Sequence, residues 1–229
     1  IINDLIKSEQ AVAQLSGSDF DKLEYVTDSK AEENVKVTLL TEGKIKKNIV
    51  DEIEETKAGD KISLAMFYLS DRSIVKELIQ AAGRGVDIRL VLDANKDAFG
   101  IEKNGIPNRQ VASELFKKSD GKIQIKWYDT HGEQFHTKLI FIEKKEESII
   151  IGGSANYTRR NLDDYNLESN IKIEVLSNNE LEEEISQYFN RIWNNEDGNY
   201  TVEFSKYQDE SFLKNLIYRF QEFSGLCTF

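Results

Sequence analysis

Two strand–helix–strand units dominate the pattern of hydrophobic and polar positions in the first half of the chain. Residues 35–39 alternate like a strand, apolar residues recur at helical spacing over 45–53, and residues 62–67 form a short apolar strand. The order then repeats, because residues 71–82 have the pattern of a helix that begins with an aspartate, and residues 86–92 are again strand-like. Short connections between such elements favour right-handed crossovers between parallel strands.

The second half of the chain changes character after a long loop at residues 94–107 and a predicted helix over about 108–118. Strand-like runs then follow one another without a helix between them, at residues 123–127, 135–142, 148–151 and 166–175. Strands that lie this close in sequence favour antiparallel pairing. We therefore expect an α/β fold with a mixed β-sheet flanked by helices on both faces, an α/β/α sandwich.

The same pattern predicts three segments along the chain. Residues 1–33 are polar and weakly periodic, with a short helical pattern that ends near Leu15, and we interpret them as a linker or connecting arm. Residues 34–195 hold the α/β domain. Residues 196–229 are expected to be a C-terminal helical extension with an amphipathic helix over 212–223. Because the chain begins with isoleucine rather than methionine, we expect a fragment of a longer polypeptide.

The net charge, the cysteine count and the lengths of the apolar runs limit what kind of protein this is and what it can bind. The 229 residues carry 30 Lys and Arg against 41 Asp and Glu, and this formal net charge of −11 repels a polyanion unless positive charge is locally concentrated. General coating of nucleic acid is therefore disfavoured. The single cysteine, Cys227, excludes an internal disulfide framework. No apolar run approaches the roughly 18 residues of a membrane-spanning helix, so we expect no transmembrane segment in this chain.

One histidine stands in a patterned context, in the run His136-Thr137-Lys138 of a predicted strand. Side chains two positions apart in a strand share a face, so the imidazole of His136 and the ammonium of Lys138 are expected to enter one pocket. A neighbouring cation lowers the pKa of histidine and keeps the ring neutral. A neutral imidazole beside a cation suits a nucleophile that attacks an anionic group.

The next two strand-like runs add polar groups that suit the same site. Gly153, Ser154 and Asn156 follow a strand end, where glycine permits close backbone approach and the hydroxyl, amide and exposed N–H groups can bind phosphate oxygens. Glu168 belongs to the following run, and a carboxylate there would accept the Nδ1–H of His136 and leave Nε2 free to attack. Three successive strands would thus bring a nucleophile, phosphate-binding groups and an orienting group together.

Several of these residues also have a purely structural interpretation. Without the glycine, serine and asparagine that follow, His136 would be interpreted as a hydrogen-bonded core histidine. His131 lies in a predicted loop and is expected to be an exposed residue rather than a second acid. The spacing of His131, Glu133 and His136 fits neither a helical pair nor a closed four-ligand set, so we expect no metal and no other cofactor. Arg159 and Arg160 fit a second phosphate or head group and a solvated surface equally well.

These motifs resemble those of a known family. His136-x-Lys138, an acidic residue five positions after the lysine, and Gly153-Ser154-x-Asn156 are similar to the HKD motif of the phospholipase D superfamily. The resemblance extends over about residues 35–193. It implies a phosphodiesterase, a hydrolase that works without a metal through a covalent phosphohistidine intermediate.

The resemblance also implies a role for each candidate residue. His136 would attack phosphorus, Lys138 would offset the charge of the non-bridging oxygens, and Glu168 would orient the imidazole. Substrate binding would fall to the residues of the second part of the motif, Gly153, Ser154 and Asn156.

Two departures from the family pattern affect the expected site. The acidic position holds Glu143, where the family has an aspartate that is largely structural, so the role of this residue is open. The family's site is built from two HKD motifs, one histidine attacking and the other protonating the leaving oxygen, whereas this chain has one. We therefore expect a second HKD repeat, either from the missing half of the same polypeptide or from a homodimer partner. Residues 132–138 and 159–166 look most like the second, C-terminal repeat of bacterial phospholipase D-like proteins.

The leading hypothesis is half of the active site of a phospholipase D-like enzyme that hydrolyses or transfers a phosphodiester, with phospholipid as the expected substrate. An HKD-type nuclease is the enzyme alternative, which the net charge of −11 disfavours because no basic stripe tracks phosphates. The alternative from another class is a non-catalytic repeat that binds phosphate or lipid and acts as a dimerisation half. The compartment is open, because the resemblance to bacterial proteins fits extracellular and membrane-associated parents alike.

Overall fold

The computed structural model describes residues 1–17, 34–98 and 101–224 of the chain. The strands are β1 (Val35–Thr41), β2 (Lys61–Met66), β3 (Asp87–Asp93), β4 (Asp97–Ala98), β5 (Ile101–Glu102), β6 (Ile123–Tyr128), β7 (Lys138–Glu143), β8 (Glu147–Gly153), β9 (Ser169–Leu176) and β10 (Thr201–Glu203). The helices are α1 (Ile2–Leu15), α2 (Gly43–Glu54), α3 (Arg72–Arg84), α4 (Asn108–Lys118), α5 (Arg159–Leu162), α6 (Glu180–Asn194) and α7 (Phe212–Ser224), with a 3-10 turn at Phe204–Lys206.

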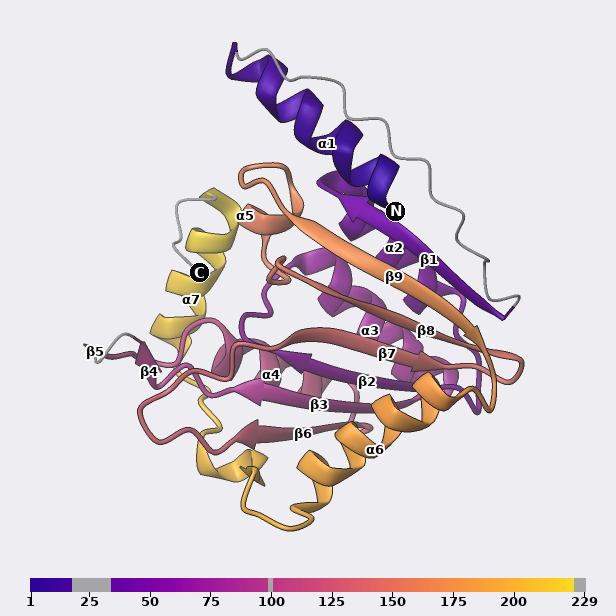
Figure 1. Ribbon diagram of the computed structural model, residues 1–229. Coiled ribbons are helices and arrows are strands. Elements are labelled where there is room, and N and C mark those ends of the chain that lie inside the picture. The colour runs from indigo at the N-terminus through magenta and orange to yellow at the C-terminus, as the bar shows by residue number, and fades with distance from the viewer. Residues whose placement is uncertain (18–33, 99–100, 225–229) are drawn as a thin grey trace.

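A single mixed sheet forms the centre of this fold (Figure 1). Its eight strands lie in the order β1-β9-β8-β7-β2-β3-β6-β10, and β4 pairs with β5 separately. β3 is parallel to both of its neighbours, β2 and β6, as the predicted crossovers require. The other neighbouring strands are antiparallel. The predicted mixed sheet is therefore confirmed.

Helices cover both faces of the sheet. In Figure 1, α2, α3 and α4 lie behind the sheet and α6 crosses in front of it. Successive side chains of β7 point to opposite faces of the sheet. Ile140 and Ile142 belong to the core shared with α2, α3 and α4, whereas Phe141 belongs to the core on the other face. There its ring stacks on Phe189 of α6 with centroids 6.2 Å apart. Burial of apolar side chains on both faces stabilises the α/β/α sandwich, as predicted.

β7 begins later than its sequence pattern indicates. The predicted strand started at residue 135, but β7 starts at Lys138, where its pairing with β2 begins. Before that point, the backbone of Thr137 accepts a single hydrogen bond from the N–H of Phe67 at 2.9 Å. His136 therefore lies on the loop that leads into the strand, and strand alternation by itself does not determine its direction.

β9 shows the same difference. It starts at Ser169 rather than at residue 166, so Glu168 also precedes its strand. The side chain of Leu167, an apolar residue of the predicted strand, is 66% exposed. Side chains alternate between the two faces of a sheet only where strands are paired. The last residue pair between β1 and β9 is Thr41 with Ser169, so residues 166–168 lie outside the paired region.

The two ends of the described chain add to the predicted segments. α1 confirms the short helix that ends at Leu15, whereas residues 18–33 of the predicted linker lie outside the described residues. The predicted C-terminal extension also supplies β10, which pairs with β6 as an edge strand of the main sheet. α7 packs through Tyr218, which is fully buried. No helix in the described ranges is long and apolar enough to span a membrane.

Candidate active site

The candidate site lies at the end of the sheet where the parallel strands β2 and β3 terminate and antiparallel β7 begins. Met66, the last residue of β2, pairs with Lys138, the first residue of β7. Phe67, which follows Met66, places its ring beside the imidazole of His136, with ring centroids 4.8 Å apart. The carboxyl ends of parallel strands are the usual location of ligand sites in open α/β sheets.

His136 and Lys138 face each other, as predicted. The amine of Lys138 lies 3.3 Å from both ring nitrogens of His136 and 3.3 Å from its carbonyl oxygen. The residue is only 7% exposed, yet among the described residues its amine makes no ion pair. Burial disfavours the charged amine and lowers the pKa of Lys138, although the nearby charge of Glu168 opposes that shift. The site therefore holds a buried amine that forms no ion pair with a carboxylate of residues 1–17, 34–98 or 101–224.

The pKa of His136 is lowered as well. Partial burial is the larger cause, and the charge of Lys138 adds to it. A lowered pKa favours the neutral imidazole near pH 7, which is the nucleophilic form. The sequence predicted this direction from the lysine alone, whereas the fold makes burial the greater influence.

A buried tether holds the loop in front of His136. The carboxylate of Asp93, 1% exposed at the end of β3, accepts the backbone N–H of Phe135 at 2.7 Å and that of Asn95 at 2.6 Å. The amide of Asn108 donates to the carbonyls of Phe67 at 2.7 Å and Asp93 at 2.8 Å. These hydrogen bonds join the ends of β2 and β3 to the loop before β7, which contains Phe135 and His136, so they fix the position of the imidazole.

Sequence reasoning did not find this tether. No spacing pattern connects residue 108 with residues 67 and 93, because they meet only through the sheet. A polar residue at the start of a predicted helix ordinarily indicates a helix terminus and nothing more. The one available signal was Asp93 at the carboxyl end of a predicted parallel strand, which is also a common position for a turn residue.

Glu168 makes different contacts from those expected. Its Oε2 accepts the hydroxyl of Ser154 at 2.5 Å, and its Oε1 accepts the amide N–H of Asn161. Among the described residues, no hydrogen bond joins Glu168 to His136. The carboxylate still acts electrostatically on the site, because its charge opposes the lowering of the pKa of Lys138. An orienting role for Glu168 towards the imidazole stays a prediction.

Gly153 permits the close approach of β8 to β9. A Cβ at this position would lie 2.3 Å from the carbonyl oxygen of Ser169 and 2.6 Å from the Cα of Asn170, so a larger residue would push the strands apart. The adjacent N–H of Ser154 donates to the same Ser169 carbonyl at 3.0 Å and is already satisfied. Gly153 thus positions Ser154, and a direct contact of Gly153 with substrate stays a prediction.

Asn156 keeps unused hydrogen-bonding capacity at the same end of the sheet. Its Oδ1 is buried and has no hydrogen-bond partner among the described residues. Buried polar atoms in native proteins are normally paired, so an unpaired one near a candidate site suits contact with a ligand or water. The unpaired oxygen accepts hydrogen bonds and does not donate them, so binding of a phosphate oxygen would have to use the Nδ2 donor of Asn156, and that role stays a prediction.

Two further candidates lie away from the His136–Lys138 pair. Glu143 ends β7 at the opposite end of the strand and pairs with Lys61 at 3.5 Å, which suits a structural role. His131 is 73% exposed, 3.7 Å from the carboxylate of Asp129, as expected for a loop residue. In the part of the chain that the structure describes, no group of three or more His, Cys, Asp or Glu side chains could hold a metal ion.

A cavity of about 430 Å³ opens beside His136. Tyr128, Tyr188 and Tyr200 are among its lining residues, and the ring of Tyr128 stacks on Phe135 with centroids 4.2 Å apart. Such a cavity can accept the part of a substrate that extends from the reacting phosphorus.

Comparison with known proteins adds to this geometry. The sequence profile of the family described as "Cardiolipin synthase, PLD-like domain" matches residues 49–193. A phospholipase D of Rickettsia prowazekii (strain Madrid E) is 34% identical over 112 residues, which are 49% of this chain and 46% of that protein. A phospholipase D of Rickettsia typhi (strain ATCC VR-144 / Wilmington) is 32% identical over 112 residues, 49% of this chain and 47% of that protein. The matched segment therefore spans about half the length of each relative.

Solved structures share the fold at low sequence identity. Nuc of Salmonella typhimurium, a phospholipase D family member, superposes with a TM-score of 0.54 at 19% identity, covering 70% of this chain and 95% of that one. A phosphatidylserine synthase of Haemophilus influenzae Rd KW20 gives a TM-score of 0.58 at 14% identity, covering 86% of this chain and 48% of that one. These similarities confirm the α/β architecture.

Proposed function

The chain belongs to the phospholipase D superfamily, and on that premise we propose that it supplies one histidine–lysine half of the active site of a phosphodiesterase that acts on phospholipid. The observation that carries the proposal is the buried amine of Lys138, which lies 3.3 Å from both nitrogens of His136 and has no ion-pair partner among the described residues. An unneutralised buried cation next to a neutral nucleophile is the arrangement that a phosphodiester anion completes.

In the proposed reaction, a ring nitrogen of His136 attacks phosphorus and forms an N–P bond while the bond to the leaving oxygen breaks. A histidine from a second HKD motif gives its proton to that oxygen. Water, or another alcohol in the transfer reaction, then attacks the phosphohistidine, loses its proton to the second histidine and releases His136. Lys138 offsets the charge on the non-bridging oxygens, and the Nδ2 of Asn156 donates a hydrogen bond to them. Ser154 can do the same only if its hydroxyl turns away from Glu168, to which it donates in the structure.

The second histidine comes from outside this motif. Either a further repeat of the same polypeptide or a second copy of this chain would supply it, because His131 is exposed on a loop, with its Nε2 3.7 Å from the carboxylate of Asp129. The proposal uses no metal, so turnover by the complete two-motif enzyme should survive EDTA.

Phospholipid is the proposed substrate for two reasons. The curated relatives with 34% and 32% identity are phospholipases D. The formal net charge of −11 also disfavours a polyanionic nucleic acid. The proposed product is a phosphatidic acid or a head-group-exchanged phospholipid.

A nuclease with the same chemistry is the second candidate, because the cavity beside His136 is lined by tyrosines on which bases could stack. Competition decides between the two: an excess of phospholipid micelles should inhibit turnover of a generic phosphodiester, and an excess of single-stranded DNA should not. The opposite result would favour the nuclease.

Trapping of the covalent intermediate tests the proposal. The two-motif enzyme, or this chain at concentrations where it dimerises, is mixed with phospholipid labelled in the phosphate and quenched. We expect an acid-labile, base-stable label on His136. The label and the turnover should both vanish in His136→Ala, with activity reduced by about four orders of magnitude or more.

His131→Ala is the matched control, since it removes the same side chain from an exposed position. It should leave label and turnover unchanged. Normal turnover in His136→Ala would overturn the proposal. Tight binding of phosphodiester without any label would instead identify a non-catalytic phosphate- or lipid-binding repeat.

A further inference from the structure

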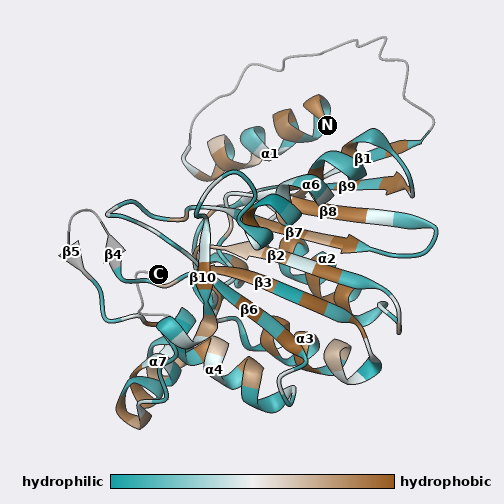
Figure 2. Cartoon of the chain, turned by 90° about the horizontal axis from the view of Figure 1, so that it is seen from below, coloured by the Kyte–Doolittle hydropathy of each residue, from teal (hydrophilic) through white to brown (hydrophobic). Residues whose placement is uncertain are grey.

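Helix α7 presents its apolar face to solvent. The exposed fraction of its large apolar residues ranges from 39% to 83%, and these residues are Phe212, Leu213, Leu216, Ile217, Phe220 and Phe223. At 3.6 residues per turn they fall on one continuous arc of the helix surface. In Figure 2, the hydrophobic brown turns of α7 lie at the periphery of the molecule.

The polar residues of α7 attach it to the rest of the protein. Glu222 is 3% exposed, and its two carboxylate oxygens accept the hydroxyl of Ser70 at 2.5 Å and the N–H of Arg159 at 3.0 Å. Tyr218 is fully buried and its hydroxyl accepts a bond from Arg72 at 2.7 Å. A surface helix normally buries its apolar side and exposes its polar side, so the orientation of α7 is reversed.

Two cations of α7 border its exposed apolar face. Its sequence contains one carboxylate, Glu222, which points inward, while Lys214 and Arg219 flank the apolar arc on its two sides. Both cations also have acidic neighbours off the helix: Lys214 pairs with Asp209 at 2.6 Å, and Arg219 pairs with Glu114 at 2.9 Å. A local apolar face bordered by cations is unexpected in a chain whose net charge is −11.

A cavity of about 410 Å³ adjoins the C-terminal half of α7. Its cationic lining residues are Lys46, Arg72, Arg159 and Arg219. Of its three acids, Asp71 and Glu222 are 2% and 3% exposed and are engaged by backbone N–H groups, which leaves Asp163 as the acid that solvent reaches. Each of the four cations also has an acidic partner, because Lys46 contacts Asp71 and Asp163, Arg159 contacts Asp163, and Arg72 and Arg219 contact Glu114. A phosphate that entered the cavity would therefore share cations that are already paired.

The apolar face lies at the same end of the sheet as the candidate active site. Ser70, which binds Glu222 of α7, follows closely after Phe67, whose ring packs beside His136. In Figure 1, α7 lies at the edge where β2 and β3 end and β7 begins. A surface that bound α7 would therefore approach the site from that edge.

We propose that α7 is a membrane-docking helix, whose apolar face inserts into the interface of an anionic phospholipid bilayer while the adjoining cationic cavity receives head-group phosphates. This inference rests on the proposed function, because a phospholipid substrate resides in such a bilayer. An exposed apolar arc with phenylalanines and flanking cations matches the chemistry of that interface. A second copy of the chain fits less well, since two-fold pairing of α7 with itself would bring its flanking cations together.

Vesicle binding tests the inference separately from catalysis. The full chain with His136→Ala, which cannot turn over lipid, is sedimented with vesicles of phosphatidylcholine containing about one third phosphatidylglycerol. We expect it to bind these vesicles more tightly than vesicles of phosphatidylcholine alone, and less tightly as salt is added. Leu216→Ser with Phe220→Ser should weaken binding by roughly tenfold or more, because two inserted apolar side chains are lost.

Leu176→Ser is the matched control, since Leu176 is 55% exposed at the end of β9, outside α7. It should bind vesicles like the parent chain. A second variant, Phe212→Ser with Phe223→Ser, repeats the test at the two ends of the helix. All the substituted side chains are exposed, so equal melting temperatures should show that each variant folds.

Three outcomes would overturn the inference: no vesicle binding, equal binding by the α7 variants and the Leu176 control, or self-association in the absence of lipid that the α7 variants abolish. The last result would identify the face as a contact between copies. Turnover of a water-soluble phosphodiester by the two-motif enzyme is measured in parallel and should not change in the α7 variants. Vesicle binding without such turnover would count against the proposed function and not against membrane docking.

Discussion

Two lysines of the same sheet are buried to the same degree and have opposite surroundings. Lys138 on β7 is 7% exposed and Lys172 on β9 is 8% exposed. The amine of Lys172 lies 2.5 Å from a carboxylate oxygen of Glu52 and 3.6 Å from one of Glu174. The amine of Lys138 has only the ring and carbonyl of His136 as its hydrogen-bonding neighbours among the described residues.

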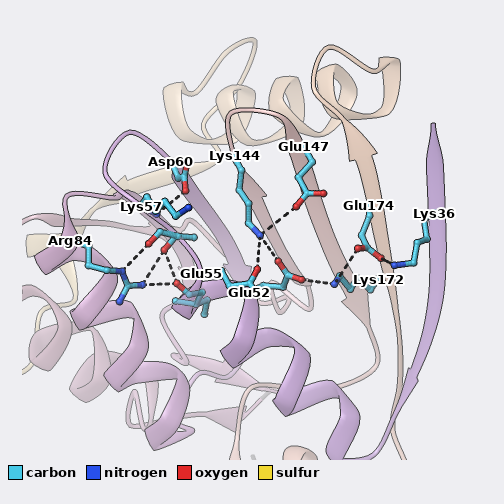
Figure 3. Close-up of polar contacts among 12 residues, drawn as sticks. Lys36, Glu52, Glu55, Lys57, Asp60, Arg84, Lys144, Glu147, Lys172 and Glu174 are labelled. Atoms are coloured by element: carbon cyan, nitrogen blue, oxygen red, sulfur yellow. Dashed lines mark hydrogen bonds and ion pairs between the residues drawn. The ribbon is translucent and has the colours of Figure 1, made fainter. Parts of the chain in front are cut away.

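The paired lysine belongs to a chain of alternating charges that crosses several elements (Figure 3). From β1 to the turn between β7 and β8, the order is Lys36, Glu174, Lys172, Glu52 and Lys144. Burial opposes ionisation of Glu52, but hydrogen bonds from Lys144 and Lys172 prevail and lower its pKa. The same partnership raises the pKa of Lys144 despite its burial.

The comparison separates a buried lysine that the protein pairs with carboxylates from one that it leaves without an ion pair among the described residues. Around Lys172 the protein supplies the anions, so the cluster is complete and joins α2 to the sheet. Around Lys138 no carboxylate of the described residues forms an ion pair, and the charge of Glu168 acts only from beyond ion-pair distance, so a bound anion would supply the missing compensation. Burial alone would not have separated the two lysines, whereas the identity of their neighbours does.

Replacement of each lysine by methionine is the sharpest test of this comparison. Lys138→Met should reduce turnover of the two-motif enzyme by about 10²–10³-fold, because transition-state charge loses its counter-ion. It should not lower the free energy of unfolding, because no ion pair is broken. Lys172→Met should do the reverse, leaving turnover intact and lowering the free energy of unfolding. Activity assays and urea denaturation measure both, and the distinction fails if the two variants behave alike.

Removal of the shared carboxylate should have the largest effect on stability. Glu52→Ala leaves the amines of Lys144 and Lys172 without their buried partner, and we expect the free energy of unfolding to fall by about 3–5 kcal/mol. Glu55→Ala is the control, because its side chain is 67% exposed although it also pairs with Lys144. Equal urea midpoints for the two variants would show that the cluster is not a buried structural unit.

Low pH should destabilise the protein by protonating the carboxylates that form buried ion pairs. The pKa of Glu114, which binds Arg72, is lowered to about 2 from 4.5, and that of Glu52 is lowered as well. A carboxyl with a depressed folded-state pKa contributes stability that is complete above its unfolded value and is lost as the pH falls through the folded value. We therefore expect the melting temperature to decline between pH 4.5 and about 2. Glu114→Gln should begin less stable and show a shallower decline, and an unchanged slope would contradict this assignment.

The smallest predicted effect concerns the pKa of His136. Lys138→Met should raise it, because one of the two influences that lower it is removed. The rise should be modest, since partial burial is the larger influence and remains. A titration followed by NMR measures the shift. A fall in the pKa of His136 would show that Lys138 acts on it other than through its charge.

The nearness of His136 and Lys138 was decided by the sequence. The two residues are two positions apart in the chain, so their backbones cannot separate far, although His136 precedes the strand that starts at Lys138. The mixed sheet could also be predicted from the sequence, because the spacing of apolar residues along a strand or helix follows from its local backbone geometry and from which faces are buried. These predictions used only interactions between near neighbours in sequence.

The partners of Glu168, the tether through Asn108 and the orientation of α7 were decided by the tertiary structure. Glu168 binds Ser154 and Asn161 rather than His136, because it precedes β9 and the strand pattern does not extend to it. The amphipathic pattern of α7 predicts a helix but not which side docks, and hydrophobic burial alone would choose the wrong one. Glu222 finds hydrogen-bond partners at Ser70 and Arg159, far away in sequence, and such contacts exist only after the sheet has brought those residues together.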